Sequence, residues 1–189
     1  MIFGITGGTG CGKTTALEAL HSLGGVCLDC DAIYHDLLKT DKALLAAIES
    51  RFPGVVKADA LDRKALGSRV FADPAALADL NAITHAAVKQ KVLELLPKDG
   101  TPAAIDAIGL FESGLDRLCG VTVGILAPKA DRLRRIMARD GIPEGYAQMR
   151  LDAQPEDGYF REKCDYILEN TGTEAEFRRK SLDFFQKFL

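Results

Sequence analysis

Short apolar runs alternate with helix-period stripes along much of the chain. Five runs have the length and composition of buried strands, namely 2–6, 26–28, 103–108, 121–127 and 166–168. The segment after the first run carries Ala16, Leu17, Leu20 and Leu23, a stripe that would pack on a sheet. This alternation predicts an α/β fold in three layers, with a parallel sheet covered by helices.

The alternation stops between about residues 41 and 96, where the pattern becomes wholly helical. Apolar stripes there predict four successive helices, with Asp62 and the Asp73-Pro74 pair as start signals for two of them. Consecutive helices without a strand do not fit regular β-α alternation. They predict a helical insertion in which a second substrate is held.

Arginines gather after the fourth predicted strand. One helix has an apolar stripe of Leu133, Ile136 and Met137, and its other face carries Arg132, Arg135 and Arg139. A second helix restarts at 141–143 and holds Arg150, and the residues from 154 to 164 read as a loop. This density suits a lid over phosphates, spanning about 131–160. The alternative is a solvated helix face.

Composition narrows the class of protein. The chain has 189 residues, 47% hydrophobic and 27% charged, which is typical of one globular domain. A net charge of −3 gives no basic field for nucleic acid, and no apolar run is long enough to span a membrane. The five cysteines are scattered and odd in number, which favours reduced thiols and, with no signal peptide, a cytoplasmic location. The pair Cys27 and Cys30 is interpreted as structural.

The most specific pattern is G-x-x-x-x-G-K-[ST], which runs from Gly7 to Thr14. It lies between the first predicted strand and the first predicted helix, as a phosphate loop requires. Its glycines allow backbone N–H groups to point at phosphate oxygens, and the helix end adds positive potential. Lys13 would reach the β- and γ-phosphates, and the Thr14 hydroxyl would bind Mg²⁺. The pattern predicts binding of a nucleoside triphosphate.

Carboxylates follow two other predicted strands. Asp29 and Asp31 come after the strand at 26–28, and ligands of open α/β sheets gather at the carboxyl ends of strands. The alternative for Asp31 is a capping role for a helix that begins at Ala32. Asp106 lies where phosphate-loop proteins often carry a Mg²⁺-orienting carboxylate. Its alternative is a bond to nearby backbone.

These segments together resemble the dephospho-CoA kinase family over nearly the whole chain. The resemblance rests on the loop at 6–15, the D-x-D at 29–31, the acceptor-side segments at 61–63, 70–71 and 83–85, the L-F-E-S-G at 110–114, the lid arginines with Gln154, and the segments at 165–167 and 170–172. Ala86, Ile108 and Cys11 depart from the family pattern.

The resemblance implies a phosphate-loop kinase that uses ATP and Mg²⁺ to phosphorylate the ribose 3′-hydroxyl of dephospho-CoA. It implies catalytic roles for Asp31, as base, and for Lys13. Nucleotide-binding residues would be Gly8, Thr9, Gly10, Cys11, Gly12, Lys13, Thr14, Thr15 and Arg139. Substrate or lid residues would be Asp29, Arg63, His85, Arg135 and Arg150.

Two other classes are weighed against this one. A nucleotide-dependent switch is suggested by D-x-x-G at 106–109, but the guanine-reading N-K-x-D is absent. Another small nucleotide or sugar kinase would share the loop and lid, and the D-x-D and helical insertion favour the first assignment over it. The sequence does not give the oligomeric state.

Overall fold

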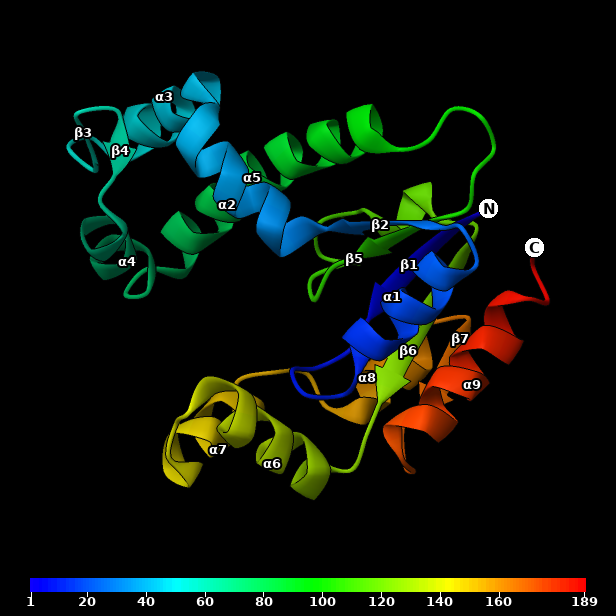
Figure 1. The fold of residues 1–189 in the computed structure, drawn as a ribbon. Coiled ribbons are helices and arrows are strands. Elements are labelled where there is room, and N and C mark those ends of the chain that lie inside the picture. The colour runs from blue at the N-terminus through cyan, green and yellow to red at the C-terminus, as the bar shows by residue number, and fades with distance from the viewer. The chain divides into compact units, whose positions relative to one another are not determined.

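The computed structural model describes residues 1–189, and the chain divides into two compact units (Figure 1). The first, here called the α/β unit, comprises Met1–Leu28 and Pro97–Leu189. The second, here called the helical unit, comprises Asp29–Leu96.

The five predicted apolar runs all form strands of one sheet. They are β1 (Ile2–Thr6), β2 (Val26–Asp29), β5 (Ala103–Asp106), β6 (Val121–Leu126) and β7 (Tyr166–Glu169), in the order β2-β5-β1-β6-β7. β1 pairs in parallel with β5 and β6, and β6 pairs in parallel with β7. The run predicted to extend to residue 108 ends at Asp106, because the following segment turns. The predicted parallel sheet is confirmed.

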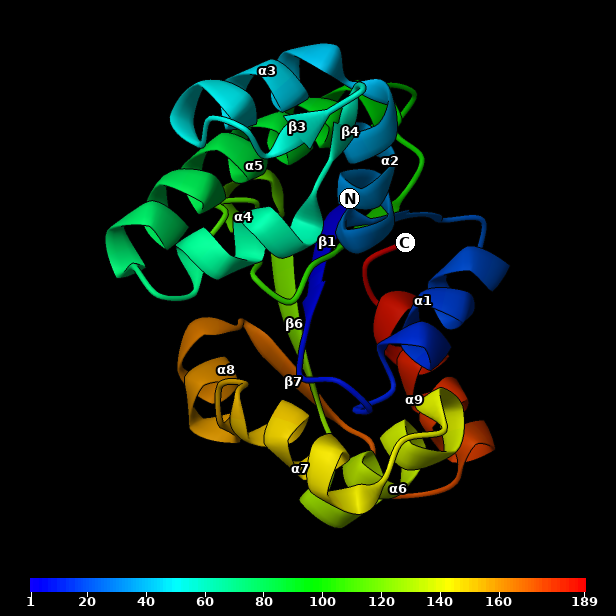
Figure 2. The same cartoon turned by 90° about the vertical axis from the view of Figure 1, so that its left-hand side faces the viewer.

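Helices cover both faces of this sheet within the α/β unit. α1 (Lys13–Ser22) and α9 (Glu174–Phe185) lie against one face, and α8 (Asp157–Lys163) lies on the other (Figure 2). The core between the sheet, α1 and α9 is built mainly from apolar side chains, and the rings of Phe3 and Phe185 meet edge to face at 5.0 Å. A capping box of Thr173 and Glu176 starts α9. The three-layer α/β/α prediction is confirmed.

Two helices follow β6 as predicted, and a third was not foreseen. α6 (Lys129–Asp140) and α7 (Glu144–Asp152) share a small core of Ile136, Ala147 and Leu151. The loop predicted for 154–164 is wrong over much of its length, because α8 occupies it. α8 has seven residues and buries only Phe160, so it leaves no apolar stripe in the sequence.

The helical unit is built around one long helix. α5 (Pro74–Leu95) contacts α2 (Cys30–Thr40), α3 (Lys42–Arg51) and α4 (Arg63–Val70). The side chains of Asp62 and Asp73 accept hydrogen bonds from the backbone at the starts of α4 and α5, as predicted.

Two details of the helical unit differ from the prediction. The region from 74 to 96 forms one helix instead of two, because no glycine or proline interrupts the buried row of Leu80, Thr84, Val88 and Val92. The segment is also not wholly helical, since β3 (Val56–Lys57) and β4 (Ala60–Leu61) form an antiparallel hairpin. Its turn places Ala58 and Asp59 at positive φ without the usual Asn-Gly signal, so this hairpin was not predicted.

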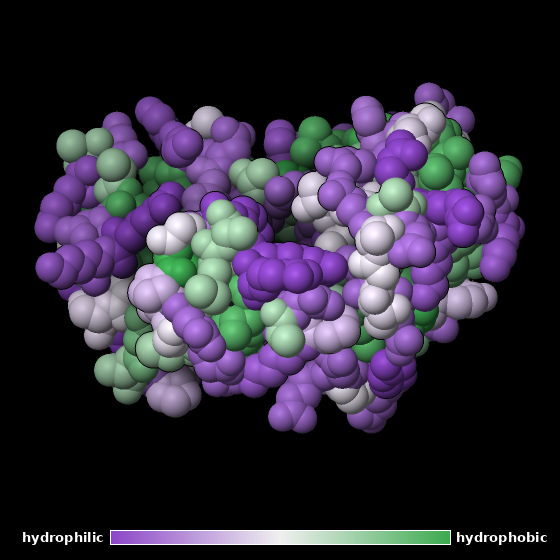
Figure 3. All heavy atoms as spheres, turned by 60° about the horizontal axis from the view of Figure 1, so that its bottom comes forward, coloured by the Kyte–Doolittle hydropathy of each residue, from purple (hydrophilic) through white to green (hydrophobic).

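The surface and the thiols are those of an ordinary globular protein. Figure 3 shows one face on which hydrophilic side chains predominate and hydrophobic ones are scattered. None of the helices is both long and apolar enough to cross a bilayer. All five cysteines are free thiols, as expected.

Candidate functional site: a phosphate loop and its neighbours

The loop between β1 and α1 has the backbone that a phosphate cradle needs. Gly7 has a φ of 140°, and a Cβ there would lie 2.3 Å from the carbonyl oxygen of Ile125. The Lys13 ammonium donates to the carbonyl oxygen of Gly7 at 2.9 Å, so the side chain folds back along the loop. No side chain caps the N-terminus of α1, and its first turn holds no acidic residue. Its first N–H groups are therefore suited to an anion.

Thr14 and Asp106 are the two candidate metal ligands. Thr14 is exposed in the first turn of α1, and Thr15 beside it is half-buried. Asp106 ends β5 and is paired in register with Ile5 of β1, the strand that leads into the loop. No cluster of three or more His, Cys, Asp or Glu side chains is arranged for a metal ion. A Mg²⁺ ion fits this sparse set, because it takes one or two protein oxygens and completes its octahedron with phosphates and water.

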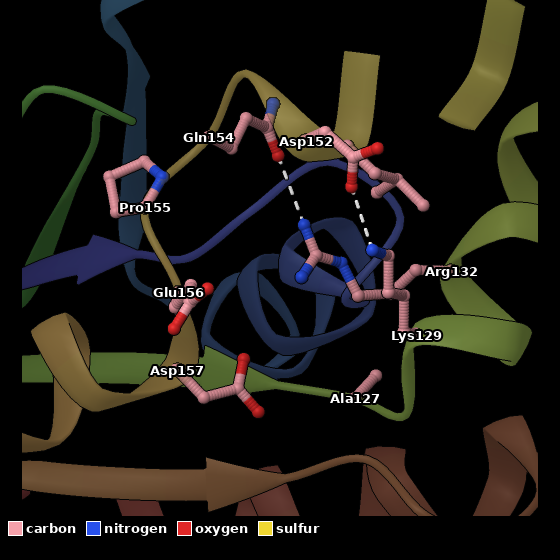
Figure 4. Close-up of a pocket in the computed structure, with 9 residues that line it drawn as sticks. Ala127, Lys129, Arg132, Asp152, Gln154, Pro155, Glu156 and Asp157 are labelled. Carbon is pink, nitrogen blue, oxygen red and sulfur yellow. Dashed lines mark hydrogen bonds and ion pairs between the residues drawn. The ribbon is translucent and has the colours of Figure 1, made fainter. Parts of the chain in front are cut away.

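Two side chains from beyond β6 bind the loop at Thr9. The Arg132 Nε donates to the carbonyl oxygen of Thr9 at 3.0 Å, and its Nη2 donates to Gln154 Oε1 at 3.0 Å. Gln154 Oε1 also accepts from the Thr9 backbone N–H at 2.8 Å, and its Nε2 donates to Thr9 Oγ1 at 2.6 Å. Figure 4 shows Arg132 from α6 and Gln154 from the loop after α7 pointing toward one another.

A cavity of about 310 Å³ adjoins these two residues. Its lining carries both signs of charge, with Lys129 paired to Asp152 at 2.7 Å and with Glu156 and Asp157 also on the lining (Figure 4). Arg132 also lines it and is only 7% exposed, so the alternative of a solvated helix face is wrong for this residue.

The remaining arginines of the predicted lid divide into two groups. Arg135 donates to the carbonyl oxygen of Gly10 at 3.1 Å and so contacts the loop. Arg139 and Arg150 instead bind Asp140, at 2.6 Å each. The hydrogen bonds from Arg139, and then from Arg150, lower the pKa of Asp140 to about 2.

The two aspartates at the carboxyl end of β2, Asp29 and Asp31, have different local roles. Asp29 is the N-cap of α2, and its side chain accepts from the Ala32 N–H at 3.0 Å. Asp31 is exposed in the first turn of that helix. The alternative in which Asp31 caps a helix starting at Ala32 is therefore wrong, because the helix starts at Cys30 and Asp29 caps it.

The other acceptor-side candidates also lie in the helical unit. Arg63 is the exposed first residue of α4, and its positive charge influences the pKa of Tyr34 in α2. Burial raises the pKa of Tyr34, while the Arg63 guanidinium partly offsets that rise. Tyr34 is three residues after Asp31, hence on the same side of α2, and this spacing could have marked it in the sequence. His85 is half-buried in α5.

Asn170 supports the loop from the end of β7, a role that was not predicted. Its Nδ2 donates to the carbonyl oxygen of Cys11 at 3.0 Å, while its Oδ1 is buried without a hydrogen-bond partner. Cys11 itself is buried, and this desolvation raises the pKa of its thiol despite the nearby Lys13. Cys11 is therefore a packing residue with an unreactive thiol.

Comparisons with known proteins agree with this geometry. The family model of dephospho-CoA kinase matches residues 1–176. The chain is 38% identical over 177 residues to a dephospho-CoA kinase of Anaeromyxobacter dehalogenans, covering 90% of this chain and 84% of the relative.

Two solved structures share the fold from end to end. A Thermus thermophilus protein is 33% identical with a TM-score of 0.84, covering 100% of this chain and 97% of that one. A dephospho-CoA kinase from Campylobacter jejuni is 32% identical with a TM-score of 0.71, covering 99% and 96%. The chain therefore belongs to the dephospho-CoA kinase family, an enzyme family of phosphate-loop transferases that acts in the last step of coenzyme A biosynthesis.

Proposed function

We propose that this enzyme transfers the γ-phosphoryl group of ATP to the ribose 3′-hydroxyl of dephospho-CoA, which gives coenzyme A and ADP. The observation that supports this most is the family match across residues 1–176, which includes both the phosphate loop and the helical unit. The bond from the γ-phosphorus to the ADP oxygen breaks, a bond to the 3′-oxygen forms, and the hydroxyl proton leaves.

The loop residues from Gly8 to Thr15 would hold the phosphates of ATP. The backbone N–H groups provide the cradle, and Lys13 would exchange its bond to the Gly7 carbonyl for phosphate oxygens. Thr14 would bind Mg²⁺, with Asp106 as a second ligand or as an orienting carboxylate. The ion would supply positive charge that partly neutralises the phosphate groups.

Asp31 would accept the proton of the 3′-hydroxyl. It is an exposed carboxylate two residues beyond β2, and Asp29 already serves as the helix cap. In a loose phosphoryl-transfer transition state the carboxylate first positions the hydroxyl and takes its proton late. The helical insertion at about 41–96 would bind the acceptor, with Arg63 and His85 as contacts.

The segment at about 131–160 would act as a lid whose Arg135, Arg139 and Arg150 bind phosphates when the nucleotide is present. Arg139 and Arg150 would first exchange Asp140 for those phosphates.

We also propose that the enzyme works in the cytoplasm, with small-molecule partners only and no nucleic acid or membrane.

An assay that couples ADP release to a measured signal tests this function. ADP release with ATP, Mg²⁺ and dephospho-CoA should greatly exceed release without the acceptor, and GTP should replace ATP poorly. Equal release with and without dephospho-CoA, but acceleration by another small alcohol, would favour the alternative of a different nucleotide or sugar kinase. GTP preferred over ATP, with no acceptor effect, would favour a switch protein.

A further inference from the structure

Arg132 is a buried cation without an acidic partner. It is 7% exposed and forms no ion pair, and its hydrogen bonds go to the Thr9 carbonyl and to the amide oxygen of Gln154. Burial of a guanidinium among neutral groups is costly unless an anion compensates it. The chain itself therefore leaves this charge to be balanced by something else.

The position of Arg132 connects that charge to the phosphate loop. A Cβ added at Gly8 would lie 2.0 Å from Arg132 Nη2, so only glycine lets the guanidinium lie against the loop backbone here. Nη2 and the Thr9 backbone N–H converge on one atom, Gln154 Oε1, at 3.0 and 2.8 Å. A loop N–H and a guanidinium that share one acceptor oxygen are the donors that a phosphate oxygen takes.

We propose that the Thr9 N–H and Arg132 Nη2 form a phosphate-oxygen subsite, which the neutral side chain of Gln154 fills before a nucleotide binds. On this proposal a phosphate oxygen displaces Gln154 Oε1, and Arg132 gains the anion that its burial requires. Gln154 then competes with phosphate for the loop, and it does not stabilise the loop for phosphate binding. The inference rests on the proposed binding of a nucleoside triphosphate by the loop, but not on the identity of the acceptor.

The sign of the change in ATP affinity shows which role Gln154 has. Substitution should tighten ATP binding if Gln154 competes with phosphate, and should weaken it if Gln154 stabilises the loop. Calorimetric titration of ATP without acceptor would compare the parent with Gln154→Ala and with the nearly isosteric Gln154→Glu. Loss of a competing hydrogen-bonded oxygen should tighten ATP binding in Gln154→Ala by roughly three- to tenfold. The carboxylate of Gln154→Glu should hold both donors more strongly and weaken ATP binding by about tenfold or more.

Gln148 offers a matched control in α7. Its Nε2 bonds to Asp152 Oδ1 at 2.8 Å and it does not contact the loop. Gln148→Ala and Gln148→Glu make the same chemical changes and should leave ATP affinity within about twofold, since a surface charge is screened. Adding Arg132→Ala to Gln154→Ala should abolish the gain.

Three outcomes would overturn the proposal. They are unchanged or weaker ATP binding in Gln154→Ala, parent-like binding in Gln154→Glu, and equal effects of Glu at 148 and 154. If Gln154→Ala fails to fold, Gln154→Glu still decides the question, with thermal unfolding as its check. If the parent protein binds ATP but shows no turnover with dephospho-CoA, that result would count against the proposed function and would leave this inference standing.

Discussion

The phosphate loop and the first turn of α2 hold their polar groups in opposite ways. The loop is enclosed by side chains from distant parts of the α/β unit, including Arg132, Gln154 and Asn170, which all bond to its backbone. Asp31 is exposed, and its neighbourhood is set by a local cap from Asp29. Tertiary contacts fix the arrangement of the loop, whereas a local helix cap fixes the arrangement around Asp31.

The difference fits the two tasks that a kinase performs. Charge on the transferring phosphoryl group is best stabilised by donors that are already in place, because they need no reorganisation during reaction. An acceptor hydroxyl needs one oriented carboxylate that water can reach until the acceptor binds. Substitutions in the loop should therefore change ATP binding and turnover together, whereas substitutions near Asp31 should spare ATP binding.

The largest effect is expected from Asp31→Asn, which keeps the shape of the side chain but cannot take a proton. We expect kcat to fall by roughly 10²–10⁴-fold. Affinity for ATP should stay within about twofold, because the substitution leaves the loop intact. Steady-state kinetics with dephospho-CoA, together with calorimetric titration of ATP, would measure both.

Two neighbouring aspartates serve as controls for Asp31. Asp29→Asn retains a good helix cap, so its effect should be far smaller. Asp36→Asn changes an exposed residue of the same helix and should be neutral. A kcat for Asp31→Asn close to that of Asp36→Asn would remove Asp31 from the chemistry.

Lys13→Ala tests the loop side of the comparison. The ammonium is proposed to stabilise charge that develops on the transferred phosphoryl group, so kcat should fall on the order of 10²–10³-fold. ATP affinity should fall as well, in contrast to Asp31→Asn. The fold should persist, since Lys13 is half-buried and bonds only to the Gly7 carbonyl. A folded variant with parent-like turnover, checked by thermal unfolding, would contradict the role of the loop.

Arg63→Lys tests the helical unit with a smaller change. Lysine retains the charge but loses the planar fork, so the Michaelis constant for dephospho-CoA should rise by about tenfold with little change for ATP. Arg69 is the matched control, because it lies in the same helix and bonds only to the Pro53 carbonyl at 2.7 Å. Equal kinetics for Arg63→Lys and Arg69→Lys would show that Arg63 is a surface residue.

The same contrast explains what the sequence could predict. The five strands of the large sheet, the loop and the Asp62 and Asp73 caps depend on residues close in the chain, and all were predicted. The bonds from Gln154 to Thr9 and from Asn170 to Cys11 join residues 145 and 159 positions apart, which periodicity does not encode. Helix spacing groups Arg132 with Arg135 and Arg139 on one face, but it does not show that Arg132 is buried and bonds to the loop.

The smallest predicted effect concerns the two arginines that Asp140 holds. Asp140 Oδ1 and Oδ2 both accept from Arg139, at 2.6 and 3.0 Å, and Oδ2 also accepts from Arg150. If these arginines act on ATP, Asp140 competes with its phosphates. Asp140→Asn removes the charge and should lower the Michaelis constant for ATP by roughly two- to fivefold, with kcat little changed, as expected for exposed ion pairs.

The pH dependence of Asp140→Asn and a second ion pair on the same helix make this test specific. The folded-state pKa of Asp140 is lowered to about 2, so the stabilisation from its ion pairs is complete above the unfolded value and is lost as pH falls toward 2. The effect of Asp140→Asn should therefore be constant between about pH 6 and 9, because Asp140 stays ionised throughout. Asp131 is the control, since it pairs with Arg134 at 2.9 Å on the same helix. If Asp140→Asn and Asp131→Asn give the same Michaelis constant for ATP, Arg139 and Arg150 are surface residues and the phosphates are bound by the loop, Arg132 and Arg135 alone.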